Sequence, residues 1–195
     1  MSADNTVHVQ FGISNAYVAV IGDDGEYETP FPVPGFVKLT IDAAGDSTTK
    51  YADNVPVYTS NANAGYTGSL EFTTICDKFY TDVLGYIKDG NGGLLETMEA
   101  KPKSFALLYQ VEGDANNARY VFYKVDAKRP TGEHNTTTES TEVDDSSMEI
   151  TMTGKQFTIG TETKTCVKNR VLNDTTGATA YASFFTAVME PKAAA

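Results

Sequence analysis

Few residues of this chain have the side chains that most often carry chemistry. Histidine, the commonest general base near neutral pH, occurs only at His8 and His134, both in polar segments. Cys76 and Cys166 lie far apart in the sequence, and neither belongs to a CxxC pair with a nearby histidine. We therefore predict two free thiols rather than a disulfide or a metal site, and we expect no catalytic residues.

Three polar loops have features of ligand sites. Asp23-Asp24-Gly25-Glu26 lacks the spacing and the distal glutamate of a calcium-binding EF-hand, so we interpret it as a solvated hairpin tip. Gly90–Gly93 lacks the Lys-Ser/Thr of a phosphate-binding loop. Ser60–Gly65 fits either a sugar-binding loop or simple turn chemistry, and turn chemistry is the commoner role. The sequence predicts no cofactor and no metal.

Composition limits the function classes. A chain of 195 residues fits one domain, with residues 190–195 expected to be a frayed tail. The net charge of −11 argues against a protein that coats DNA, because such proteins bind phosphates through Lys and Arg. The N-terminal segment is polar and does not resemble a signal peptide.

The stretch from Tyr51 to Tyr86 contains the sharpest change of periodicity. Residues 55–58 form a short extended run, residues 60–65 are typical of a turn, and residues 69–73 again alternate polar and apolar. This pattern predicts a hairpin between the two runs.

After this predicted hairpin the apolar period changes from two to about four residues. The stripe consists of Ile75, Phe79, Val83 and Ile87, with Tyr80 and Leu84 alongside. It predicts the only helix of the chain, from about Asp77 to Leu84, capped by Thr74 or Asp77 and ended by Gly85. Its candidate packing residues are Phe79, Val83 and Leu84.

Further strands are predicted on both sides of this stretch. The prolines at 30, 32 and 34 favour an edge strand or loop, and residues 43–47 favour a turn. The runs 105–111 and 120–125 predict a second hairpin, buried on both faces because it is almost continuously apolar. Other expected strands are 16–21, 36–41 and 148–153, with weaker candidates at 94–95, 156–159 and 166–172, and 180–189 as a strand or short helix.

Residues 130–147 form an acidic segment without Lys or Arg. Such a segment buries too little apolar surface to fold alone, so we expect it to be mobile in the isolated subunit and ordered on binding a partner. A solvated excursion without function is the alternative. The candidate assembly residues are Thr131, Glu133, Glu139, Glu142, Asp144 and Asp145.

These elements together predict a mainly β fold. We expect an antiparallel β-sandwich or partly closed barrel, with one flanking α-helix and long loops or arms.

Several stretches resemble the tail tube proteins of long-tailed bacteriophages with non-contractile tails. They are YADN and YTSNANAGYTGSLE, the FYTDVLG helix, KPKSFALLYQVEGD, RYVFYKVDAKRP and PGFVKLTID, within residues 7–153. The resemblance implies a structural virion protein whose hexameric rings stack into a hollow tube for DNA delivery. Its implied partners are other copies of itself and the tape measure, tail terminator and distal tail proteins, with no membrane partner. The implied location is the virion tail, and the host cytoplasm during assembly.

DNA would pass through such a tube without specific binding. An acidic excess on the inner wall would repel the duplex over a Debye length of roughly 8–10 Å. The net charge of −11 is consistent with that role and also with solubility alone. The alternative function is a stand-alone β-sandwich binding module, such as an adhesin-like or carbohydrate-binding domain. The lack of Trp and of an export signal argues against this module.

Overall fold

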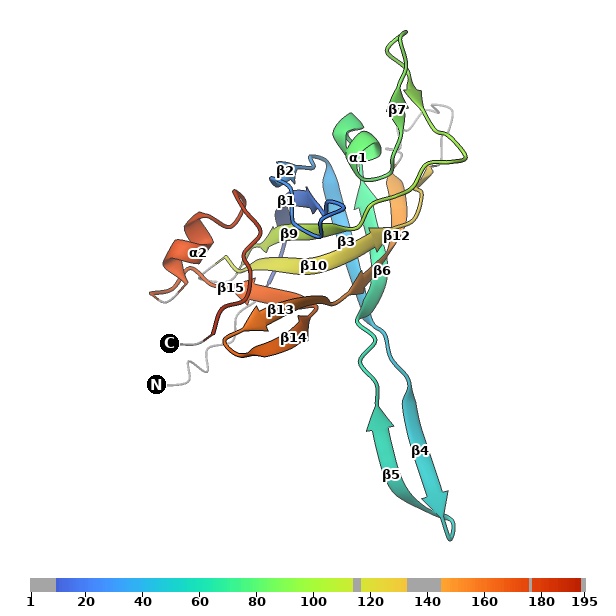
Figure 1. The fold of residues 1–195 in the computed structure, drawn as a ribbon, viewed down its shortest axis with the longest axis vertical. Coiled ribbons are helices and arrows are strands. Elements are labelled where there is room, and N and C mark those ends of the chain that lie inside the picture. Colours follow the sequence, from blue (N-terminus) through green and yellow to red (C-terminus); the bar gives the residue numbers. More distant parts are fainter. Residues whose placement is uncertain (1–9, 114–116, 133–144, 176, 194–195) are drawn as a thin grey trace.

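The computed structural model describes residues 10–113, 117–132, 145–175 and 177–193. It confirms a mainly β fold with antiparallel pairing and, in the part of the chain described, no closed barrel. The main sheet follows the path β2-β1-β9-β10-β12-β6-β3 (Figure 1). Along this path the strands are β2 (Phe31–Pro32), β1 (Ile13–Val20), β9 (Phe105–Val111), β10 (Arg119–Ala127), β12 (Ser146–Thr153), β6 (Tyr66–Phe72) and β3 (Phe36–Ala43).

The remaining strands are short additions to this sheet or separate hairpins. β11 (Thr131–Gly132) pairs with β12, and β15 (Lys168–Val171) pairs with β10. The separate hairpins are β4 (Ser47–Ala52) with β5 (Val55–Asn61), β7 (Ile87–Lys88) with β8 (Leu94–Leu95), and β13 (Lys155–Ile159) with β14 (Glu162–Cys166).

The sheet curls because its two edge strands are neighbours in sequence. Only residues 33–35 separate β2 from β3, although these strands are the first and the last of the sheet path. The Val33 amide donates to Ala16 of β1, and the Thr73 amide, just after β6, donates to the Gly35 carbonyl. The connection therefore brings the two edges of the sheet close together, and β2 is an edge strand, one of the two structures that the prolines at 30, 32 and 34 favour.

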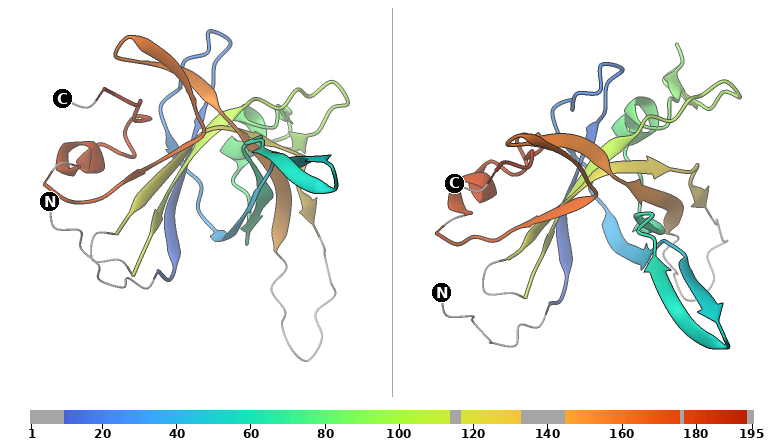
Figure 2. Two further views of the ribbon diagram at one scale, coloured as in Figure 1. Left: turned by 90° about the horizontal axis from the view of Figure 1, so that it is seen from below. Right: turned by 60° about the horizontal axis from the view of Figure 1, so that its bottom comes forward.

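β9 and β10 form the centre of the fold and confirm the predicted second hairpin. Alternate residues of β9 enter two different apolar clusters, which explains its continuous apolar sequence. On one face, Phe105 and Leu107 pack with α1 (Asp77–Asp82). On the other face, Ala106 and Leu108 pack with Phe157 of β13 and with Phe184. Figure 2 shows α1 and the C-terminal segment on different sides of the sheet.

α1 begins and ends by backbone contacts. Its N-cap is Cys76, without a side-chain cap hydrogen bond, so the predicted cap at Thr74 or Asp77 is wrong. The Thr74 hydroxyl instead donates to the Thr73 carbonyl. Gly85 has a φ of 76°, and the following amide, of Tyr86, donates to the Tyr80 carbonyl. The predicted glycine stop is therefore confirmed as a left-handed C-terminal turn.

A second helix, α2 (Ala178–Ala182), corrects the expectation of a single helix and overlaps the segment 180–189, for which a short helix was one of the two alternatives. Its five residues carry no strong apolar stripe, and contacts with the sheet hold the segment. The Arg119 guanidinium stacks over Tyr181, 3.7 Å from the ring centroid, and over Phe185 at 4.6 Å. The same side chain donates to the Tyr181 carbonyl. In the described ranges, neither helix has the length or apolar character needed to span a membrane.

The hairpin predicted between residues 55–58 and 69–73 is wrong. β5 pairs with β4, and β6 pairs with β3 and β12. The predicted turn at 43–47 is wrong as well, because Ala44 exchanges hydrogen bonds with residues 64–65 opposite it. Residues 36–72 therefore form one long hairpin, since the ladder between residues 44–46 and 62–65 continues the β3–β6 pair into the β4–β5 pair.

Candidate assembly interface

The outer half of the long hairpin, β4–β5, is called the arm from here on. Its tip is the two-residue turn Asp53-Asn54, with φ values of 52° and 64°. Two positive φ values are typical of a type I′ turn, whose twist matches that of the flanking strands. Asp and Asn tolerate this conformation better than other residues with a Cβ atom.

The arm exposes large apolar side chains. Tyr51, Val55, Val57 and Tyr58 are exposed by 68%, 58%, 62% and 61%. A two-stranded hairpin is marginally stable in water without a third partner, and it has no core of its own. The arm projects from the body, as Figure 1 and the right-hand view of Figure 2 show. Clustered apolar side chains on such a projection are typical of a surface that another protein covers.

Glycines at the root of the arm allow very close backbone packing. A Cβ atom on Gly65 would lie 2.2 Å from the Met152 carbonyl oxygen of β12, and one on Gly45 would lie 1.9 Å from the Ala62 carbonyl oxygen. Both residues also have positive φ, 87° and 147°. The arm therefore leaves the sheet through positions that only glycine fits.

A second projection is the β7–β8 hairpin. The Asp89 carboxylate accepts hydrogen bonds from the backbone amides of Asn91 and Gly93, which closes the tip as an Asx-type turn. Gly90–Gly93, which lack a phosphate-binding motif, are thus the end of a hairpin. The exposed apolar residues here are Ile87 at 54%, Leu95 at 52% and Met98 at 95%.

Polar contacts hold this hairpin against the body. An Arg129 guanidinium nitrogen lies 3.0 Å from the Glu96 carboxylate, and the hydrogen bond from Arg129 lowers the pKa of Glu96. Burial, followed by the neighbouring Glu96, raises the pKa of Tyr86 to about 12. The Tyr86 ring also packs against the Tyr80 ring of α1, with 5.1 Å between centroids.

These contacts predict a specific loss of stability at alkaline pH. The folded chain holds the Tyr86 proton more tightly than the unfolded chain does. The protonated Tyr86 therefore makes its full contribution to the free energy of unfolding below about pH 10, the ordinary tyrosine pKa. It is lost as the pH rises through about 12. When urea unfolding is measured at pH 8 and at pH 11, the free energy of unfolding should therefore fall less between the two pH values in Tyr86→Phe than in the wild type. Equal losses in the two proteins would contradict the assignment.

The arm and the β7–β8 hairpin lie at opposite ends of the longest axis of the molecule (Figure 1). They differ in sequence and shape, so a contact between them on two copies would be heterologous. A heterologous contact between opposite ends gives open linear growth rather than a closed dimer.

The structure describes only some of the candidate assembly residues, and it describes all three candidate helix-packing residues. Thr131 lies in β11 opposite Ser147 and donates to its carbonyl oxygen at 3.2 Å, and Asp145 is exposed. Glu133, Glu139, Glu142 and Asp144 lie outside the described residues. Phe79, Val83 and Leu84 are all buried in the cluster between α1 and the sheet.

The apolar arm was not predicted from the sequence. The pattern places Val57 and Tyr58 in a strand whose predicted partner lies after residue 65, whereas the structure pairs this strand with β4. The dipeptide Asp53-Asn54 between two β-branched or aromatic runs was the available signal, because both residues tolerate positive φ.

The remaining sequence interpretations have mixed outcomes. Residues 22–25 form a hairpin tip in which Asp24 accepts from the Glu26 amide, as predicted. Cys76 and Cys166 are free. His8, His134 and residues 194–195 of the expected frayed end lie outside the described residues. Within those that are described, no group of three or more His, Cys, Asp and Glu could hold a metal ion.

A model of the phage tail tube protein family matches residues 2–194. Curated proteins give no match. Among solved structures, the tube-terminating cap of the anti-feeding prophage is similar, with 11% identity over 88% of this chain and 99% of the other and a TM-score of 0.43.

Two further solved structures are similar. The sheath–tube complex of an extracellular contractile injection system in the extended state shares 11% identity over 87% of this chain and 94% of the other, with a TM-score of 0.44. The anti-feeding prophage baseplate shares 9% identity over 88% of this chain and 97% of the other, with a TM-score of 0.38.

Proposed function

This chain belongs to the phage tail tube protein family, and on that premise we propose that it is the repeating subunit of hexameric rings stacked into a hollow tail tube. The tube delivers DNA from the capsid to the host cell. The subunit acts by assembly and has no catalytic role. Its location is the virion tail, and the host cytoplasm during assembly.

The exposed apolar arm is the observation that carries this proposal most directly. An isolated subunit gains nothing from four large apolar side chains on a projecting hairpin, whereas a polymer buries them. The β7–β8 hairpin at the other end of the molecule supplies a second, different apolar surface. Successive rings need such a pair of unlike surfaces, because stacking is a heterologous contact.

The charge of the chain suits a conduit for DNA. A basic channel would retain the duplex through its phosphates. A chain with a net charge of −11 can place more Asp and Glu than Lys and Arg on the inner wall, and the duplex then slides. At the two ends of the tube, the same ring surfaces would meet the distal tail and tail terminator proteins, with the tape measure inside the lumen.

Assembly of the purified protein tests this function. Size-exclusion chromatography and negative-stain microscopy at increasing concentration should show rings or tubes for the wild type. The double variant Val57→Thr/Tyr58→Ser, which makes the arm polar, should stay monomeric and keep its melting temperature. Ser60→Ala, an exposed polar position on the same strand, is the matched control and should assemble normally.

Two outcomes would contradict the proposal. A wild type that remains strictly monomeric at high concentration would favour a stand-alone binding module. Normal tubes from Val57→Thr/Tyr58→Ser would remove the arm from the assembly contacts.

A further inference from the structure

A cleft lined by lysines is unusual in this acidic chain. It has a volume of about 590 Å³ and lies between the turn at 22–25, the segment 101–104 and the strands β10 and β13. Four of the fifteen Lys and Arg residues line it, namely Lys101, Lys103, Lys124 and Lys155. Asp23 is the one carboxylate among the lining residues, and Asp126 lies nearby as the acceptor of the Ser104 hydroxyl. The cleft is therefore net positive in a protein of net charge −11.

Three of these lysines make no close contact through the ammonium group among the residues described, although Lys103 contributes, after the hydrogen bonds from Thr81 and Lys78, to the lowered pKa of Asp82. Lys155 donates to the Gly25 carbonyl at 2.6 Å and stacks over the Tyr27 ring, so it holds the turn in place. Lys101, Lys103 and Lys124 have no side-chain hydrogen bond or ion pair within the part of the chain described. Most other lysines with a defined contact are paired, as Lys38 is with Glu71. The nearby carboxylates of Asp23 and Asp82 thus compensate only part of the positive charge of the cleft.

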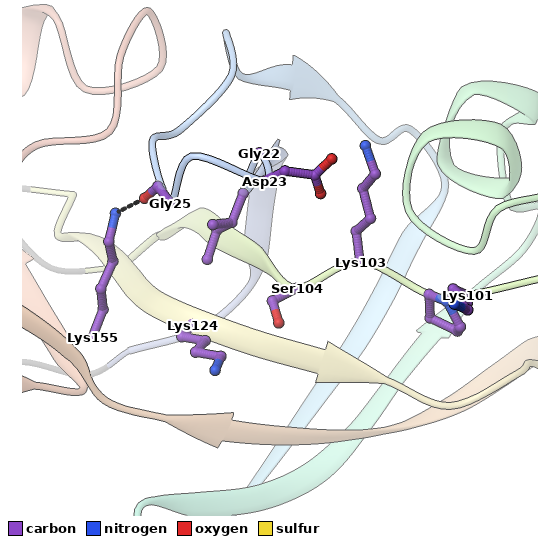
Figure 3. Close-up of a pocket in the computed structure, with 10 residues that line it drawn as sticks. Gly22, Asp23, Gly25, Lys101, Lys103, Ser104, Lys124 and Lys155 are labelled. Atoms are coloured by element: carbon purple, nitrogen blue, oxygen red, sulfur yellow. Dashed lines mark hydrogen bonds between the residues drawn. The ribbon is translucent and has the colours of Figure 1, made fainter.

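The lysines are spread along the cleft. Figure 3 shows Lys155 near Gly25 at one side, Lys124 and Lys103 further along, and Lys101 at the other side. Ammonium groups spaced in this way do not converge on a single small anion. They suit an extended chain with carboxylates at intervals, because each lysine is a flexible point charge that meets a separate partner.

This chain contains such a segment. Residues 133–145 carry five carboxylates, at positions 133, 139, 142, 144 and 145, and no Lys or Arg. The segment is attached at the Gly132–Ser146 pair, at the first residue of β12. The cleft lies at the other end of that strand, where Lys124 pairs with Thr153. Seven residues of strand separate the two places by about 23 Å.

We propose that the lysine cleft of one subunit binds the acidic segment 133–145 of a second copy of this chain. This inference rests on the proposed assembly and names the surfaces of one subunit contact in it. Two separated, complementary patches on one chain are what a closed ring of heterologous contacts requires. They also orient the subunits, because copies that both carry a charge of −11 repel each other except where such patches meet.

Charge reversal on each side tests the contact. The cleft variant is Lys101→Glu/Lys103→Glu, and the segment variant is Glu139→Lys/Glu142→Lys. Each alone should assemble at least about tenfold less well than the wild type, measured as the concentration at which rings appear. Combining all four substitutions in one chain should restore assembly. Lys164→Glu/Arg170→Glu, at exposed basic positions outside the cleft, is the control and should assemble like the wild type.

Mixing the two variants separates a contact between copies from one within a chain. In a mixture, the cleft of each variant has a segment of opposite charge on the other, so alternating subunits should restore assembly. Recovery in the four-substitution chain but not in the mixture would mean that the segment binds its own chain and would overturn the proposal. Assembly unaffected by either reversal would overturn it as well, while leaving the tube function intact.

A peptide-binding measurement tests the same contact without requiring the wild-type protein to assemble. A labelled peptide of residues 131–147 should bind the full-length protein, and Lys101→Glu/Lys103→Glu should weaken binding at least about tenfold, followed by fluorescence anisotropy. A peptide with Gln and Asn in place of Glu and Asp should bind the wild-type protein as weakly as the original peptide binds the cleft variant. Displacement of the peptide by inorganic phosphate, or tighter binding of duplex DNA, would identify phosphate as the ligand and overturn the proposal. Peptide binding without rings or tubes would count against the tube function alone.

Discussion

Phe79→Ala is expected to lower the free energy of unfolding by about 3–5 kcal/mol, a large share of the stability of a small domain. The Phe79 side chain is fully buried between α1 and the sheet. Its ring meets that of Phe105 edge to face, with 5.6 Å between centroids, and lies 6.4 Å from that of Phe72. Alanine would leave a cavity that these rings, fixed on separate strands, cannot close.

Urea or thermal unfolding of the purified variant measures this loss. Phe11→Ala is the matched control, because Phe11 is 66% exposed, and its effect should stay within about 0.5 kcal/mol. If Phe79→Ala unfolds at the wild-type denaturant concentration, α1 does not pack on the sheet in solution.

Gly65→Ala is expected to cost roughly 2–5 kcal/mol. The φ of 87° accounts for about 1–2 kcal/mol, because a Cβ atom is disfavoured in the left-handed region. The rest comes from the contact of 2.2 Å that the new Cβ atom would make with the Met152 carbonyl oxygen. Relief of that contact requires β12 and the root of the arm to move apart, at a cost of about 1–3 kcal/mol.

Gly25→Ala separates these two contributions. Gly25 has a similar φ of 82°, but a Cβ atom there would meet nothing within 4 Å. Its cost should therefore be only about 1–2 kcal/mol. Equal losses of stability in the two variants, measured by urea unfolding, would mean that the close approach at Gly65 contributes nothing. We further expect Gly65→Ala to weaken assembly, since it displaces the arm.

Local sequence was sufficient wherever neighbouring residues decide the structure. The four-residue apolar spacing around Phe79 predicted α1, because a helix forms among contacts close in sequence. The continuous apolar run of β9 predicted a strand buried on both faces, and the structure places its alternate residues in two clusters. The prolines at 30, 32 and 34 predicted an edge strand or a loop, because proline cannot donate to a ladder, and β2 is an edge strand.

The sequence also determined the class of the protein. Its composition disfavoured enzymes and proteins that coat DNA, and its stretches resembling tail tube proteins agree with the family model over residues 2–194.

Only the tertiary structure decided which strands pair and which surfaces remain uncovered. The alternating apolar residues Val55 and Val57 would look the same in a core strand and in an exposed arm, because alternation indicates that one face is buried but not what buries it. The lysine cleft could not be predicted either, since Lys101 and Lys155 come to line one cleft only through strand pairings between residues far apart in sequence. Pairing partners, and with them the arm and the cleft, depend on the register of the whole sheet, which no local pattern contains.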